Sequence, residues 1–450
     1  MHQRTDLQQE LNHEDTRSTI ASDLRWGLDP CCSGAKNGRM TKSLLTSLAL
    51  VALFAPGQDQ AQDQPKDKVS TRDSEQAAAR AAASGATAVR PSDWPSYRGN
   101  AALQGVAPGS LASRFEVAWT YQTEGAITSS PVLAFGIVYV GSSDGALYAL
   151  DRDTGKLLWS FKTEDMVEAP PFVHGGRVYF GSNDFHFYAL DAKTGALAWK
   201  LETDDKIMGG AAAWVDPDAE ADSAVRIIFG SYDNKLHAVE AKTGKKLWEY
   251  TTDNYVNGTP AIDGERIVFG GCDAILHVVS ARTGKKLTSV ELGDDCHVAG
   301  SVALADGKAW FGHYGNRFVS VDLEKGAIDW QYGDGDQAFF SSPAIGEDRV
   351  IFGGRDRVVH CVKKKDGTKL WSFTTKRKVD ASPVLCGDKV VAASGDGRLY
   401  VFDVATGKLA FQYEIGRPIY SSPAVSNGWI YVGSNDSRLY AFKPAPGEAR

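Results

Sequence analysis

The side chains that could do chemistry in this sequence recur at one position of a repeated sequence motif. Eight times the chain carries a Ser-Ser-Pro triplet or a relative of it. The residues three positions before the proline or its replacement are Thr128, Glu168, Met208, Asn257, Ala299, Phe340, Asp380 and Tyr420. Glu168, Asn257 and Asp380 carry the carboxylate and amide oxygens that Ca²⁺ prefers. A calcium site is one hypothesis for these positions, and a solvated polar lining is the other.

One insertion also groups carboxylates. It runs from Val215 to Val225, and its acidic residues alternate: Asp216, Asp218, Glu220 and Asp222. A calcium-binding loop begins in this way, but it needs a glutamate at its twelfth position, where this chain has Ile227. We therefore interpret the insertion as a solvated acidic hairpin. The chain carries no H-E-x-x-H motif, nucleophile elbow, phosphate loop or metal-ligand spacing of cysteines.

Two cysteines are placed where a disulfide bond could form. Cys272 lies in a turn between two expected strands, and Cys296 lies in the loop that leads into the next repeat. Loops of these two types are expected on the same face, and an exported protein permits disulfides. We predict either a Cys272–Cys296 bridge or two free thiols.

The elements that must position these residues follow from a repeat of about forty residues. One column of the repeat holds Trp119, Trp159, Trp199, Trp248, Thr288, Trp330, Trp371 and Phe411. Other columns hold a turn glycine, a turn aspartate and the Ser-Ser-Pro triplet. Each unit reads as four short strands rich in Val, Tyr, Leu, Phe and Trp, separated by glycine-bearing turns. Such a unit is typical of one blade of a β-propeller.

Counting the columns predicts an all-β fold, an eight-bladed β-propeller of four-stranded blades over residues 93–443, with a tail at 444–450. The last unit ends at Phe442 without a fourth strand of its own. The tryptophan column, in contrast, begins at Trp119, before the first complete unit. We therefore expect the N-terminal strand FEVAWTYQT to complete the last blade, because this closure leaves no exposed sheet edge.

The residues before the repeat predict export. Residues 40–57 combine a basic start with a short apolar run, as a secretory signal peptide does. Residues 1–39 are interpreted as a non-native or disordered extension, and the polar residues 58–92 as a disordered linker. A membrane anchor is the alternative for the apolar run. The net charge of −7 and the pI near 5.8 argue against a nucleic-acid surface. We expect a monomer in the periplasm or cell envelope, with no stable membrane span after cleavage.

Two segments resemble the quinoprotein (PQQ-like) repeat superfamily of eight-bladed propellers: DWPSYRGN (Asp93 to Asn100) and the following YVGSSDGALYALDRDTGKLLW. The resemblance covers nearly the whole chain after residue 93. It implies one of two classes. The first contains dehydrogenases that use pyrroloquinoline quinone (PQQ) and Ca²⁺. The second contains BamB-like envelope proteins, which are non-enzymatic scaffolds for the insertion of outer-membrane proteins.

The dehydrogenase class implies a calcium site, a tryptophan platform, an aspartate base and often an adjacent cysteine pair. The only adjacent pair here, Cys31 and Cys32, precedes the propeller, and the long insertions that build a cofactor pocket are almost lacking. The chain therefore resembles the BamB-like class more closely. A PQQ-dependent alcohol dehydrogenase, or a degenerate descendant of one, stays as the alternative.

The loops that enter the blades predict a surface for a protein partner. Most are acidic, but the loop into the seventh blade is basic, and Arg417 adds a cation in the next. Such a field can orient a partner, and aromatic side chains can anchor it. The predicted partner-binding residues are Glu168, Tyr255, Asn257, Phe339, Phe340, Lys376, Arg377, Lys378, Asp380, Arg417 and Tyr420. We predict a non-enzymatic scaffold without a cofactor.

Overall fold

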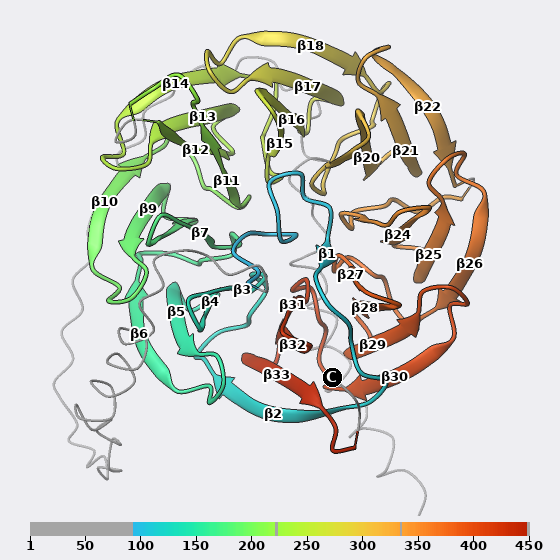
Figure 1. Cartoon of the computed structure of the whole chain (residues 1–450). Helices are drawn as coiled ribbons and strands as arrows, with labels where there is room; N and C mark the ends of the chain where they lie inside the picture. Colours follow the sequence, from blue (N-terminus) through green and yellow to red (C-terminus); the bar gives the residue numbers. More distant parts are fainter. Residues whose placement is uncertain (1–92, 221–223, 334, 448–450) are drawn as a thin grey trace, which may run out of the picture. The chain divides into compact units, whose positions relative to one another are not determined.

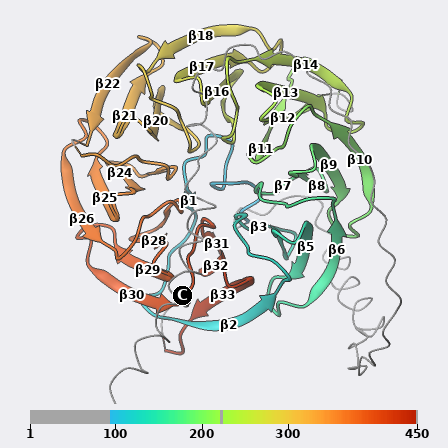
Figure 2. The same cartoon turned by 180° about the vertical axis from the view of Figure 1, so that it is seen from behind.

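The computed structural model describes residues 93–447 except 221–223 and 334, and it is a ring of eight β-sheets around one axis (Figures 1 and 2). The predicted eight-bladed propeller is confirmed. The expected extension, signal peptide and linker (residues 1–92) lie outside the described residues. Within the described residues, no helix has the length and apolar character that crossing a membrane requires.

Each of the first four blades is a meander whose first strand lies nearest the axis (Figure 1). Blade 1 contains β3 (Val132–Ala134), β4 (Ile137–Gly141), β5 (Ala146–Asp151) and β6 (Leu157–Lys162). Blade 2 contains β7 (Phe172–His174), β8 (Arg177–Gly181), β9 (His186–Asp191) and β10 (Leu197–Glu202). Blade 3 contains β11 (Ala211–Val215), β12 (Val225–Gly230), β13 (Lys235–Glu240) and β14 (Lys246–Thr251). Blade 4 contains β15 (Ala261–Asp263), β16 (Arg266–Gly270), β17 (Ile275–Ser280) and β18 (Lys286–Glu291).

The other four blades continue the ring. Blade 5 contains β19 (Ala303–Ala305), β20 (Lys308–His313), β21 (Arg317–Asp322) and β22 (Ala327–Tyr332). Blade 6 contains β23 (Ala344–Ile345), β24 (Arg349–Gly353), β25 (Val358–Lys363) and β26 (Lys369–Thr374). Blade 7 contains β27 (Val384–Cys386), β28 (Lys389–Ala393), β29 (Arg398–Asp403) and β30 (Leu409–Glu414). Blade 8 contains β31 (Ala424–Ser426), β32 (Trp429–Ser434), β33 (Arg438–Pro444) and the N-terminal β2 (Phe115–Gln122).

The predicted ring closure is confirmed. Strand β2 pairs antiparallel with β33, from Phe115 opposite Pro444 to Gln122 opposite Arg438. The last strand therefore reaches Pro444, one residue beyond the predicted boundary of the propeller. Because the two ends of the propeller share one sheet, opening the ring requires breaking this ladder.

The tryptophan column links each blade to the next. Trp119 of blade 8 donates its indole N–H to the carbonyl of Arg152 in blade 1, at 3.0 Å, and covers the turn glycine Gly155. A methyl group at Gly155 would lie 2.5 Å from the indole ring. The same indole–carbonyl bond recurs from Trp159, Trp199, Trp248, Trp330 and Trp371. Where Thr288 replaces the tryptophan, the glycine of the next blade, Gly326, has open space above it.

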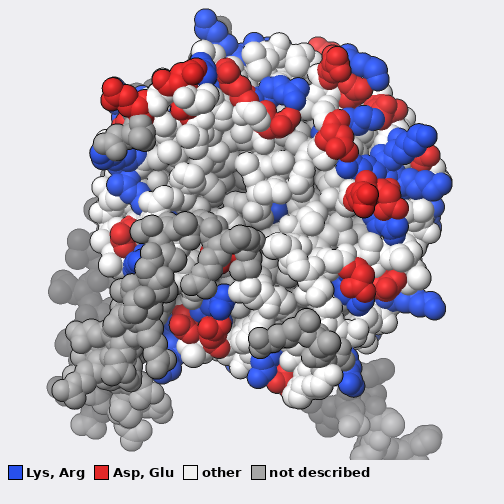
Figure 3. Space-filling view, in the orientation of Figure 1, with Lys and Arg blue, Asp and Glu red and all other residues white. Residues whose placement is uncertain are grey.

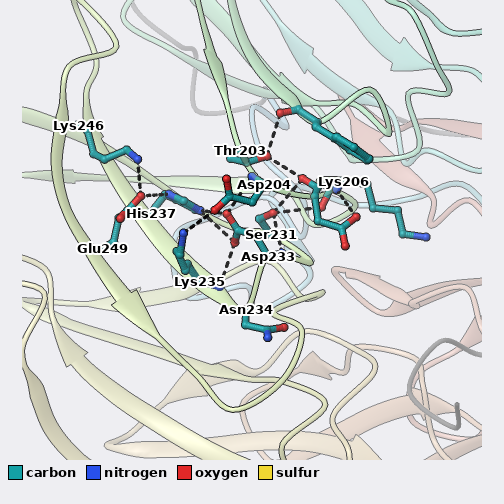
Figure 4. A network of polar contacts seen from close by, with 12 residues as sticks. Thr203, Asp204, Lys206, Ser231, Asp233, Asn234, Lys235, His237, Lys246 and Glu249 are labelled. Atoms are coloured by element: carbon teal, nitrogen blue, oxygen red, sulfur yellow. Dashed lines mark hydrogen bonds and ion pairs between the residues drawn. The ribbon is translucent and has the colours of Figure 1, made fainter. Parts of the chain in front are cut away.

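The aspartate column holds the turn between the second and third strands. In blade 1, Asp144 accepts the hydroxyl of Tyr148 at 2.9 Å. In blade 3 the buried His237 takes the place of the tyrosine, with Nε2 2.9 Å from Asp233 and Nδ1 3.2 Å from Glu249 (Figure 4). Burial would raise the pKa of Asp233, but the hydrogen bond and charge of His237 outweigh it and lower that pKa. The aspartates of this column therefore stabilise the turns between strands.

An N-terminal segment crosses the centre of the ring before the closing strand begins (Figure 1). We call residues 93–107 the N-terminal clasp. Inner strands of six blades each donate a backbone N–H to one of its carbonyls: Leu133 to Trp94, Val173 to Pro95, Ile262 to Ala101, Leu304 to Ala102, Ile345 to Gln104 and Leu385 to Gly105. Its last two residues form β1 (Val106–Ala107), parallel to β27. The clasp therefore ties blades together from the inside, as the tryptophans do from the outside.

The predicted disulfide bond between Cys272 and Cys296 is wrong. Cys296 carries a free thiol. Cys272 is disulfide-bonded, but not to Cys296. The physical reason is orientation: the sulfur of Cys296 faces Gly315, in a turn of its own blade 5, rather than the turn of blade 4 that holds Cys272.

A matched pair of glycine substitutions tests the tryptophan contact. Gly155 and Gly326 have nearly the same left-handed backbone, with φ of 69° and 64°. Alanine at either position costs about 1 kcal/mol of backbone strain. We expect G155A to lose roughly 1–3 kcal/mol more than G326A, because its methyl group must displace Trp119. Equal losses, measured by urea unfolding, would contradict this role of the indole.

Alkylation of the native protein tests the free thiol. Burial, together with Asp295 and Asp294, raises the pKa of Cys296. Burial raises the pKa of Cys361 to about 12 and that of Cys386 to about 11. Iodoacetamide should therefore label Cys296 faster than Cys361 or Cys386, at a rate that rises with pH as the thiolate forms. Peptide mapping would contradict the assignment if Cys296 reacted only after reduction.

Candidate functional site at the axial pocket

The candidate site is a pocket on the ring axis, at the end where the inner strands begin. Its volume is about 160 Å³. Tyr97 of the clasp is one of its walls. Six of the eight positions singled out by the repeat also line it: Met208, Asn257, Ala299, Phe340, Asp380 and Tyr420. The sequence alignment thus located the axial lining correctly.

A hydrogen-bond relay explains the Ser-Ser-Pro column beneath this pocket. In turn, a backbone N–H of one blade donates to a side-chain hydroxyl of the next, at 2.9–3.0 Å: Gly210 to Thr259, Thr259 to Ser301, Ser301 to Ser342, Ser342 to Ser382, Ser382 to Ser422 and Ser422 to Ser130. The hydroxyl of Tyr97 also lies 3.2 Å from Ser342 Oγ and 2.9 Å from Ser382 Oγ. The relay satisfies backbone donors that would otherwise be buried without partners.

The guanidinium of Arg98 lies deeper along the same axis. Arg98 is 1% exposed and donates through Nη2 to the carbonyls of Pro343, at 3.0 Å, and Pro383. Burial lowers its pKa to about 10. A side chain at Gly105 would collide with it, so glycine is required there. Tyr97 and Arg98 together fill the axis with residues of the chain itself.

On one side of the mouth, two cations hold one carboxylate. Asp380 lies 3.2 Å from Arg355 Nε and 2.9 Å from Lys378 Nζ. Each cation also lies over an aromatic ring: Arg355 at 3.6 Å from the centroid of Phe340, and Lys378 at 5.1 Å from that of Tyr420. We call these five residues the Asp380 clamp. It combines the aromatic and cationic groups that anchor protein partners.

On the opposite side of the pocket, a second group of residues also combines a carboxylate, a cation and aromatic rings. Glu168 accepts a 2.9 Å hydrogen bond from the amide of Asn183. Burial raises the pKa of Glu168, although Asn183 and the charge of Lys206 act against the shift. Lys206 lies 4.7 Å from the ring centroid of Tyr232, which stacks on Tyr255 at 4.7 Å. Tyr255 and Glu168 were both predicted as partner-binding residues, and the structure places them on this side of the mouth.

The residues expected to bind calcium are not brought together as ligands. Glu168 is engaged by Asn183, while Asp380 is held by Arg355 and Lys378. In the described part of the chain, no three His, Cys, Asp or Glu side chains gather around a point that could hold a metal ion. The pocket of about 160 Å³ is also smaller than ligand sites usually are. The residues present therefore do not fit PQQ with Ca²⁺.

Two predicted partner-binding residues are placed differently from expectation. Phe339 is 4% exposed and packs edge-on against Phe352, with ring centroids 5.5 Å apart, so its prediction as a surface anchor is wrong. The reason is its direction, because Phe339 points into the sheet interface while its neighbour Phe340 points to the mouth. In the predicted basic sector, Lys376, Arg377 and Arg417 are exposed, but Lys378 turns toward Asp380.

The repeat analysis missed Arg355 and Tyr232. Both stand at a variable position immediately before the turn aspartate, Asp356 and Asp233 respectively, as Asn183 stands before Asp184. These three side chains reach the groups at the mouth described above. Reading the variable position as well as the constant ones would have found them.

The acidic insertion is not a fully solvated hairpin. Asp216 is buried and pairs with Arg226 at 2.7 Å and with Arg282 at 3.0 Å. Both arginines lie over the ring of Trp214, and Arg282 also contacts the exposed Asp218. The first carboxylate of the insertion is thus part of a structural ion-pair network between blades 3 and 4.

A family model described as outer membrane protein assembly factor BamB matches residues 103–254, 212–354 and 355–450. The chain belongs to this PQQ-like repeat family. Comparison of the sequence with curated proteins finds no significant match.

Solved structures share the fold at low sequence identity. BamB from Moraxella catarrhalis is 18% identical, with a TM-score of 0.63, over 75% of this chain and 100% of that one. Quinohemoprotein alcohol dehydrogenase from Comamonas testosteroni is 15% identical, with a TM-score of 0.69, over 84% of this chain and 86% of that one. A europium-containing methanol dehydrogenase is 13% identical, with a TM-score of 0.67, over 79% and 98%. These likenesses show that the chain shares its fold with a BamB protein and with two dehydrogenases.

Removing the central carboxylate tests the Asp380 clamp. In D380N, Arg355 and Lys378 lose their shared anion and repel each other across the mouth. Because all three side chains are partly exposed, we expect a loss of about 1 kcal/mol in unfolding free energy. The control is D348N, which breaks an exposed pair with Arg349 at 2.7 Å. If urea unfolding showed equal losses for the two variants, the clamp would have no special role.

Proposed function

We propose that this protein is a non-enzymatic binding scaffold of the cell envelope that supports the assembly of outer-membrane or envelope proteins through protein–protein contacts. The family description and the signal-like residues 40–57 support the envelope setting. The fold alone serves both scaffolds and dehydrogenases, so the choice between them rests on the axis of the ring.

The observation that carries the proposal is the occupied axis. In a quinoprotein enzyme the axial region would have to accept a tricyclic cofactor, but here Tyr97 and Arg98 fill it and bond to the inner blades. What stays accessible is a rim with partly exposed aromatic rings and cations, such as Phe340, Tyr420 and Arg355. Rings and guanidinium groups of this kind dominate the energetics of protein interfaces.

Charge at the rim supplies orientation. On the face drawn in Figure 3, across which the clasp runs in the same view of Figure 1, the visible charged side chains lie mainly toward the outer edge. The basic Lys376, Arg377 and Arg417 are exposed beside loops that are otherwise acidic. A partner with an acidic patch would approach the basic sector and be held away from the acidic loops.

Charge reversal tests the binding surface. Affinity capture from envelope extracts with the tagged protein should recover a β-barrel assembly component. We expect the triple variant K376E/R377E/R417E to capture at least tenfold less of it, because the steering charge is inverted. The matched control, K285E/K286E, reverses two exposed lysines at the turn between β17 and β18 and should leave capture unchanged.

The enzyme alternative has its own readout. Incubation of the purified protein with PQQ and Ca²⁺ should give no bound-quinone absorbance and no dye-linked oxidation of alcohols. Appearance of both would overturn the scaffold proposal, as would capture that is insensitive to the triple reversal.

A further inference from the structure

A second cavity lies away from the axial pocket, between the clasp and blades 2 and 3. It has a volume of about 480 Å³, within the usual range for ligand sites. Its lining is uncharged: it includes Pro95 and Leu103 of the clasp, Phe172 to Gly175 of blade 2, and Ala211 to Ala213 of blade 3. Burial lowers the pKa of His174, which keeps its ring neutral at pH 7, and the ring stacks on Phe172.

The cavity borders an unpaired sheet edge. In an antiparallel pair, successive N–H groups point alternately toward and away from the partner strand. The N–H of Asp216 bonds to Ala224, on the side of β12, so those of Ala213 and Val215 point to the open edge of β11. Ala213 corresponds to Leu133, Val173 and Ile262, which all donate to the clasp. Among the described residues, no backbone carbonyl accepts from Ala213.

The reason for the gap is the path of the clasp. It bonds to blade 2 through Pro95 and to blade 4 through Ala101. Between these points the chain turns inward to place Tyr97 and Arg98 on the axis, and a bond from Gly99 N–H to the Ser96 carbonyl closes the turn. Among the described residues, the clasp therefore accepts no backbone hydrogen bond from the inner strand of blade 3.

The sequence of blade 3 enlarges this gap. The other blades carry Ser-Ser-Pro or a relative of it, and then Leu, Val or Ile at the position that corresponds to Ala213. Blade 3 instead reads Gly209-Gly210-Ala211-Ala212-Ala213. Its inner strand is also longer than its counterparts, five residues against two or three, because the insertion extends the hairpin. The extension ends in Val215, which is 53% exposed although it is apolar.

We propose that the free edge of β11 and the adjoining cavity bind an extended, uncharged peptide segment of a partner protein, which adds as a strand beside Ala213 and Val215 and places an apolar side chain in the cavity. The occupant is argued from the ring itself, where the inner strands of six blades donate a backbone N–H to the clasp. At two of them the clasp adds as β-structure, through the Trp94–Leu133 bridge and through β1 beside β27. Strand addition of this kind takes affinity from main-chain hydrogen bonds and specificity from side-chain pockets. An acidic or basic side chain would be desolvated there without a partner.

This slot lies where the inner strands end, whereas the axial pocket lies where they begin. It therefore adds a second binding site to the scaffold, and it does not depend on the envelope role. Its test uses only purified protein and synthetic peptide, so either proposal can fail without the other.

The probe is the peptide acetyl-Thr-Val-Thr-Leu-Thr-Val-Thr-amide, with a second version in which aspartate replaces leucine. Binding is measured by fluorescence anisotropy, and the site by hydrogen-exchange mass spectrometry. We expect slower exchange at 211–215 with the leucine peptide, and at least tenfold weaker binding of the aspartate peptide. Absence of binding up to about 1 mM, the weak limit for such a contact, would overturn the proposal.

Two variants at Ala213, with V173P as the control, test whether the peptide binds in the slot. A213P removes the donor, and because that N–H has no internal partner the variant should fold stably. V173P removes the equivalent N–H that bonds to Pro95, and it should lower the unfolding midpoint. A213L fills the cavity and serves if A213P fails to fold. We expect each Ala213 variant to bind the peptide at least tenfold more weakly.

Two other outcomes contradict strand addition. If the peptide protected 211–215 equally in wild type, A213P and A213L, it would bind elsewhere and act at a distance. If binding survived in A213P but was lost in A213L, the cavity would accept an apolar group without backbone pairing, and would be a small-molecule site instead.

Discussion

The ladder between β2 and β33 is the constraint on which the rest of the structure depends. It joins the two ends of the propeller in one sheet, and so turns eight similar blades into a closed ring. Closure brings blade 8 beside blade 1, where Trp119 can reach Arg152 and Gly155. Most of the other blades make the same indole contact with the next blade, so the tryptophan column links neighbouring blades around the ring. An open array would leave two sheet edges exposed to other chains.

The interior of the ring is fastened by different chemistry. Hydroxyls just before the inner strands accept hydrogen bonds from the neighbouring blade, and carbonyls of the clasp accept a backbone N–H from six inner strands. Tyr97 and Arg98 complete this inner layer at the axis. Function follows from what the layer leaves open: a rim of aromatic and charged groups at one end, and an unpaired edge at blade 3 near the other. We propose both as recognition surfaces.

Much of this could be predicted from the sequence, because the repeat fixes it. The blade number, the closing strand and the axial positions such as Asn257 and Tyr420 all follow from columns with a constant period. The wrong predictions concern side chains that could point in either of two directions. Phe339 points inward and Phe340 outward, and periodicity alone does not separate them. Cys296 turns to its own blade rather than to Cys272. The route of the clasp was also not predictable, because the bonds that it accepts from the inner strands are backbone bonds that carry no sequence signature.

The central claim is that the clasp permanently occupies the axis of a closed ring. Hydrogen exchange of the native protein, resolved to single amides along the inner strands, tests it most directly. The account predicts that the N–H groups of Leu133, Ile262 and Leu385, which bond to the clasp, exchange as slowly as those in the β2–β33 ladder, and that Ala213 exchanges much faster. Fast exchange at all four positions would show that the clasp detaches and the axis opens, and it would contradict the account.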